Sequence, residues 1–76
     1  MNISVVIPLL NEQDSLTELH NWIVNVMQSH DFSYEIIFID DGSTDKSWKT
    51  ITQLSEKNKY VKGIRFLNNF GKSQAL

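Results

Sequence analysis

Residues 36–45 read IIFIDDGSTD, a run of four apolar residues that ends on two aspartates, a glycine and several small polar side chains. A short apolar run rich in β-branched residues is typical of a strand buried in a parallel sheet. Gly42 tolerates a positive φ, so a tight turn into a helix is expected after the aspartates. The pattern predicts a strand at residues 34–39. It places Asp40 and Asp41 where the chain leaves the core, so that neither carboxylate need be buried.

The segments on either side repeat the same two patterns. Residues 3–10 (ISVVIPLL) form another apolar run, and Pro8, which has no N–H, is expected at the end or edge of that strand. Residues 60–67 predict a third strand. Between these runs, apolar side chains recur at helical spacing over residues 13–30 and 45–57.

Residues 72–76 resemble the first turn of a further helix, so the element order is β-α-β-α-β-(α). Helices between strands predict an α/β fold with a three-stranded parallel sheet and right-handed crossovers. A spatial strand order of 3-2-1 would put both helices on one face and leave the other face open. Because open parallel sheets are rare, we expect a truncated, Rossmann-like half-domain, or self-association of the chain through its uncovered sheet face.

Composition excludes several classes of protein. The 76 residues allow one domain, and the lack of cysteine rules out disulfides and thiolate metal sites. Seven basic and nine acidic residues are scattered along the chain, which argues against a nucleic-acid partner. No apolar run approaches the ~20 residues that cross a bilayer, and no secretory signal is recognisable, so the chain is expected to be cytoplasmic.

Polar clusters follow each predicted strand, at residues 8–12, 40–45 and 68–72. Ligands of parallel α/β sheets bind beyond the carboxyl ends of the strands, so these clusters are expected to meet at one ligand edge. Carboxylates and amides suit base edges and ribose hydroxyls, and a helix start beside Lys72 suits a phosphate. Each residue alone also has a plain structural interpretation, since Asn11 and Ser43 are common helix caps.

Three segments carry a resemblance to a known family: VVIPLLNEQDSL (5–16), YEIIFIDDGSTDKSW (34–48) and IRFLNNFGKSQAL (64–76). In this order and spacing they resemble the opening of the inverting family 2 glycosyltransferases of GT-A fold. The dolichyl- and undecaprenyl-phosphate sugar transferases are the most similar group. The resemblance implies that residues 1–76 form the N-terminal, nucleotide-binding part of an incomplete glycosyltransferase domain.

The resemblance also implies ligands and site residues. The donor would be a UDP- or GDP-sugar, and the acceptor a polyprenyl phosphate at the cytoplasmic face of a membrane. Asn68 departs from the family pattern, which usually has an arginine there. The nucleotide-binding residues would be Pro8, Asn11, Glu12, Asp40, Asp41, Gly42, Ser43, Gly71 and Lys72.

The family's metal motif, Asp-x-Asp, has no counterpart in these 76 residues, and the adjacent pair Asp40 and Asp41 is not that motif. The resemblance therefore implies that Mg²⁺ or Mn²⁺ serves the longer parent enzyme through ligands outside this chain. We expect no metal site and no catalytic residue here, and no activity from the chain alone.

Two other interpretations remain open. One is a non-catalytic nucleotide-binding or structural half-domain. The other is a haloacid-dehalogenase-like phosphatase. The segment FIDDGST is similar to the Asp-x-Asp-Gly-Thr motif of those enzymes, but their two aspartates alternate with another residue and follow the first strand, whereas here they are adjacent and follow the second. A dinucleotide-binding domain fits worse, because it needs Gly-x-Gly-x-x-Gly where this chain has PLLNEQ.

Overall fold

The computed structural model describes residues 2–66 of the chain. Its elements, in order, are β1 (Asn2–Leu9), α1 (Leu16–Ser29), β2 (Ser33–Asp40), α2 (Ser47–Lys57) and β3 (Val61–Arg65). The predicted order of strands and helices is confirmed. The expected helix at residues 72–76 and the loop before it lie outside the described residues.

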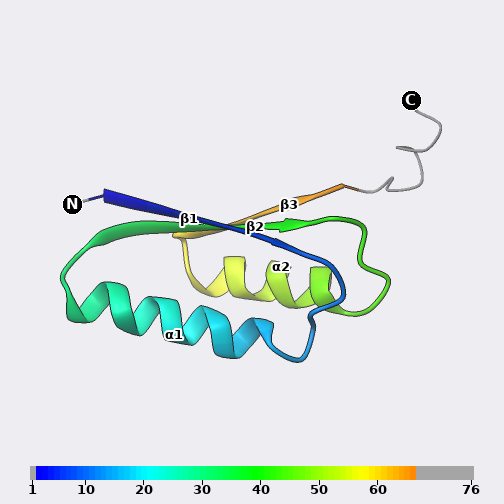
Figure 1. Cartoon of the computed structure of the whole chain (residues 1–76), viewed down its shortest axis with the longest axis horizontal. Helices are drawn as coiled ribbons and strands as arrows, with labels where there is room; N and C mark the ends of the chain where they lie inside the picture. The colour runs from blue at the N-terminus through cyan, green and yellow to red at the C-terminus, as the bar shows by residue number, and fades with distance from the viewer. Residues whose placement is uncertain (1, 67–76) are drawn as a thin grey trace.

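The three strands form one parallel sheet in the spatial order β1-β2-β3. Figure 1 shows α1 and α2 side by side against the same face of this sheet. Within residues 2–66 no element covers the opposite face, as the sequence predicted. We call this opposite face the open face.

Alternation along the strands decides which side chains enter the core. In β2, Ile36, Phe38 and Asp40 point toward the helices and are fully buried, whereas Ile37 and Ile39 lie on the open face and are partly exposed. The buried apolar cluster comes from all five elements and comprises Leu9, Leu16, Ile23, Ile36, Phe38, Ile51, Leu54 and Val61.

Pro8 lies at the outer edge of the sheet, as expected for a residue that cannot donate to a ladder. The backbone oxygen of Leu9 accepts the N–H of Asp41, at 3.0 Å, so Leu9 directs its backbone groups toward β2. Its neighbour Pro8 therefore faces the free edge of β1, where the missing N–H costs no hydrogen bond within the sheet.

Element boundaries differ from the sequence predictions by a few residues. α1 begins at Leu16 after an N-cap at Ser15, three residues after Gln13, where the helical spacing in the sequence begins. The preceding residues are held by the loop after β2 instead of joining the helix. Trp22 is 65% exposed on α1 and so does not belong to the core.

The described residues contain no helix that is both long and apolar enough to cross a membrane.

Candidate functional site

The loops after β1 and β2 lie together at the carboxyl edge of the sheet, on the right in Figure 1. We call residues 10–15 the first loop and residues 41–46 the second loop. The predicted site residues up to Ser43 lie in these loops or at the carboxyl ends of the strands that precede them. Gly71 and Lys72, also predicted to bind the nucleotide, lie outside the described residues.

The two adjacent aspartates occupy opposite environments. Asp40 is 0% exposed, and its Oδ1 accepts the backbone N–H of Ser43 at 2.7 Å. Its Oδ2 has no hydrogen-bond partner among the described residues. Asp41 is exposed. The expectation that neither acid need be buried is therefore wrong for Asp40, because the alternation of β2 points that side chain at the helices while Asp41 already belongs to the loop.

Gly42 has a φ of 91°, so the predicted left-handed turn is confirmed. Any residue with a Cβ would be strained in this conformation. The turn brings the N–H of Ser43 back onto the carboxylate of Asp40, so that the second loop leaves the strand in a fixed direction.

Asn11 connects the two loops and does not cap α1. Its N–H donates to Ser43 Oγ at 2.8 Å. Its Oδ1 accepts the N–H groups of Thr44, at 2.9 Å, and Asp45, at 3.3 Å. Asn11 Oδ1 is thus the acceptor for two N–H groups of the backbone that leads into α2, and Asn11 itself has a φ of 53°.

The next residues of the first loop extend this connection. Gln13 Oε1 accepts the N–H of Lys46 at 2.7 Å, and the N–H of Glu12 donates to Ser47 Oγ at 2.8 Å. The sequence analysis missed Gln13 and Ser47, because neither belongs to a local motif. Their pairing arises only because parallel pairing of β1 and β2 puts the two loops next to each other.

Every N–H group from residue 43 to residue 47 donates to a side-chain oxygen. The acceptors are, in order, Asp40, Asn11, Asn11, Gln13 and Asp45. A phosphate-binding loop needs backbone N–H groups that point at the ligand. The N–H groups of this stretch are all used within the protein, so the polar group that the second loop offers a ligand is the exposed Asp41 side chain.

Asp45 has a lowered pKa. Loss of solvation, the largest single effect, acts to raise it. Hydrogen bonds from the Ser47 side chain and from backbone N–H groups, including those of Ser47 and Gln13, together outweigh that effect and lower the pKa. The carboxylate is therefore favoured in the folded chain, where its Oδ1 accepts the N–H of Ser47, the first residue of α2, at 2.8 Å.

Replacement of Asp45 by asparagine is expected to lower the melting temperature at neutral pH, with the difference shrinking in acid. The pKa of Asp45 is lower in the folded chain than in the unfolded chain, where it is about 3.9, so the ionised side chain stabilises the fold above that pH. This stabilisation is lost as the pH falls through the lower pKa of the folded chain. Melting curves of both proteins from pH 7 to pH 2 test this. Asp31→Asn, at an exposed aspartate beyond α1, is the control, and a pH-independent difference for Asp45→Asn would contradict the assignment.

No group of three His, Cys, Asp or Glu side chains among residues 2–66 is placed to hold a metal ion. Asp40 is buried beneath the turn, and both carboxylate oxygens of Asp45 accept N–H groups of the protein. These side chains do not fit a divalent ion, for which the family resemblance implies ligands outside this chain.

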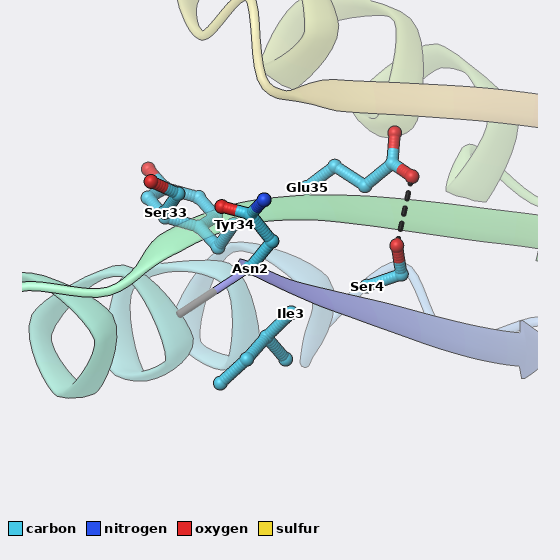
Figure 2. Close-up of a pocket in the computed structure, with 6 residues that line it drawn as sticks. All are labelled: Asn2, Ile3, Ser4, Ser33, Tyr34 and Glu35. Atoms are coloured by element: carbon cyan, nitrogen blue, oxygen red, sulfur yellow. Dashed lines mark hydrogen bonds between the residues drawn. The ribbon is translucent and has the colours of Figure 1, made fainter.

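Two hollows lie near the ends of β1. Figure 2 shows the first, of about 220 Å³, at the amino ends of β1 and β2, where the Ser4 hydroxyl donates to Glu35 at 2.8 Å. That hydrogen bond, with a smaller effect from Lys62, holds the pKa of Glu35 below its ordinary value. This hollow is at the wrong end of the sheet for the predicted site.

The second hollow, of about 400 Å³, lies between β1 and the start of α1 at the carboxyl edge. Pro8 and Glu12 line it, and the Ser15 hydroxyl donates to Glu12 Oε1 at 3.0 Å. The structure thus places Pro8 and Glu12 beside one hollow and Asp41 and Gly42 on the neighbouring loop, with Asn11 joining the two groups.

The sequence profile of glycosyl transferase family 2 matches residues 4–76, nearly the whole chain. The chain therefore belongs to glycosyl transferase family 2. Three parallel strands with two helices are the arrangement expected of the Rossmann-like half of a GT-A domain. The family assignment disfavours the phosphatase interpretation.

Two relatives align over all 76 residues. An uncharacterized glycosyltransferase of Synechocystis sp. is 37% identical, and a dolichol-phosphate mannosyltransferase of Pyrococcus furiosus is 41% identical. The chain spans 24% and 21% of the length of these two proteins.

Proposed function

We propose that this chain binds the nucleoside part of a nucleotide-sugar donor within a glycosyltransferase. The observation that supports this most directly is the difference between the backbone N–H groups around the second loop and the Asp41 side chain. The backbone N–H groups of residues 43–47 are engaged within the protein, whereas the Asp41 carboxylate is exposed beside a glycine turn. A carboxylate accepts hydrogen bonds from base N–H groups and ribose hydroxyls, and it repels phosphates.

The proposed donor is a UDP- or GDP-sugar, and the proposed acceptor is a polyprenyl phosphate. The name of the Pyrococcus relative, a dolichol-phosphate mannosyltransferase, supports a lipid-phosphate acceptor. In the reaction, an acceptor phosphate oxygen would form a bond to the anomeric carbon while the bond to the nucleoside diphosphate breaks, with inversion. An ionised phosphate needs no strong general base, so positioning and charge neutralisation would supply most of the catalysis.

The remaining requirements of the reaction are proposed to lie outside these 76 residues. They include the Mg²⁺ or Mn²⁺ ligands, the acceptor site and attachment to the cytoplasmic face of a membrane. We therefore expect the isolated chain to bind nucleotide without transferring sugar.

Binding of UDP or GDP to the isolated chain, followed by NMR or calorimetry, tests the proposal. Asp41→Asn is expected to weaken binding about tenfold to a hundredfold, since it removes one charged hydrogen-bond acceptor. The preference between UDP and GDP identifies the base. Asp31→Asn, the same chemical change in an exposed residue away from the carboxyl edge, should bind as the wild type does.

Absence of binding at millimolar nucleotide, by a chain shown to be folded, would reject nucleotide binding by this chain and favour the structural half-domain. Equal binding by the wild type and Asp41→Asn would reject the role of Asp41.

We also propose that the isolated chain self-associates through its open face. The half of this face nearest the carboxyl edge is apolar, and Val6 and Ile64 are each about half exposed. The other half is polar, with Lys62 3.4 Å from Glu35 and Glu35 bonded to Ser4. A two-fold axis through the apolar half would bury it against a second copy while leaving both polar halves in water.

Light scattering is expected to give a dimer mass for the wild type at NMR concentrations and a monomer mass for Ile64→Lys. Trp22→Lys, which removes an exposed apolar side chain from the other side of the molecule, should stay dimeric. A monomer mass for the wild type at every concentration would contradict this proposal.

A further inference from the structure

We propose that Asn11 is a positioning residue that fixes the Asp41–Gly42 turn relative to Pro8 and Glu12, so that both loops receive the nucleotide as one rigid unit. This inference rests on the proposed function. It reassigns Asn11 from a ligand contact, as the family resemblance suggested, to a residue that acts through Asp41.

The first argument is the reciprocity of the hydrogen bonds. Asn11 both donates to the second loop, through its N–H to Ser43 Oγ, and accepts from it, through Oδ1 to Thr44 and Asp45. Its residue separation from these partners is 32 to 34. The backbone and side chain of one residue thus make three of the hydrogen bonds that join two loops far apart in the sequence.

The second argument is the position of Asp41 between two fixed points. The N–H of Asp41 donates to the backbone oxygen of Leu9 at 3.0 Å, which ties it to β1 on one side. Two residues later, Ser43 is bonded to Asn11 in the first loop and to Asp40 in β2. Asp41 and Gly42 therefore form a short span whose ends are both attached. The Asn11 side chain adds to the attachment of the second end through Thr44 and Asp45, the residues that follow Ser43.

The third argument is the conformation of Asn11 itself. Its φ of 53° lies in the left-handed region, which asparagine tolerates better than most residues with a Cβ. Asparagine also offers an uncharged acceptor for two N–H groups. Glycine would keep the backbone conformation without the acceptor, and aspartate would keep the acceptor without the amide NH₂.

These two substitutions separate positioning from direct contact. Asn11→Gly is expected to weaken UDP or GDP binding about tenfold, because the bonds to Thr44 and Asp45 are lost. Asn11→Asp is expected to keep affinity within about threefold of the wild type, because its carboxylate accepts the same N–H groups. A loss of binding in Asn11→Asp as large as in Asn11→Gly would overturn positioning and favour a contact through the amide NH₂. Asn25→Ala, at an exposed asparagine of α1, is the control.

Amide hydrogen exchange of the free chain gives a readout that does not depend on nucleotide. In Asn11→Gly, the N–H groups of Thr44 and Asp45 should exchange faster, while that of Ile36 in the core should not change. Unchanged exchange at Thr44 and Asp45 would overturn the inference. Faster exchange with wild-type nucleotide affinity would also overturn it, since the loops would then be coupled without effect on binding. Failure of the wild type to bind nucleotide would instead reject the proposed function, and exchange would still decide whether Asn11 couples the loops.

Discussion

Replacement of Phe38 by alanine is expected to leave the chain largely unfolded at 25 °C. Phe38 is 0% exposed at the centre of the middle strand, where the residues packed around it come from both helices and both neighbouring strands. Loss of a buried phenylalanine side chain costs about 3–5 kcal/mol, through lost burial and the cavity left behind. A single core of this size supplies only about 3–5 kcal/mol of stability, so the substitution removes most or all of it.

Urea denaturation followed by circular dichroism measures this effect, and Ile37→Ala is the matched control. Ile37 is the next residue of the same strand, but its side chain lies on the open face and is partly exposed. Its truncation should leave the chain folded, with a smaller loss of stability. Equal denaturation midpoints for the two variants would mean that the helices do not pack on the face assigned to them.

The order of elements and the meeting of the first two loops at one edge of the sheet were predictable from the sequence, because both follow from local patterns. Apolar runs such as residues 36–39 define strands, helical spacing defines the segments between them, and parallel strands bring their following loops to one edge. The positive φ of Gly42 was predictable for the same reason, because glycine is the residue that adopts this conformation without strain.

The burial of Asp40 and the exposure of Asp41 were not predictable in the same way. It depends on which face of β2 each residue occupies, and a shift of one residue in the strand would exchange their environments. The pairing of Gln13 and Asn11 with the second loop was hidden for a related reason. Each looks like an ordinary helix start in its own segment, and only the parallel register of β1 and β2 gives them partners more than 30 residues away.

Replacement of Gly63 by alanine is expected to destabilise the chain by about 1–3 kcal/mol, although it adds only one methyl group. Gly63 lies on β3 with its Cα facing α2. A Cβ there would sit 2.6 Å from Ile51 Cγ2 and 3.1 Å from two ring atoms of Trp48. The branched side chain of Ile51 is held in one rotamer on its helix, so its Cγ2 cannot swing away. Relief would require α2 to move off β3.

Thermal and urea denaturation test this prediction, with Lys62→Ala as a control on the same strand, where the side chain lies on the open face and 66% of it is exposed. A second substitution identifies the cause. Ile51→Leu removes the branch methyl that a Cβ at residue 63 would meet, so it should cost less in the Gly63→Ala background than in the wild type. Additive costs would place the strain elsewhere. Coupled costs would show that the close approach of β3 to α2 requires glycine at this position.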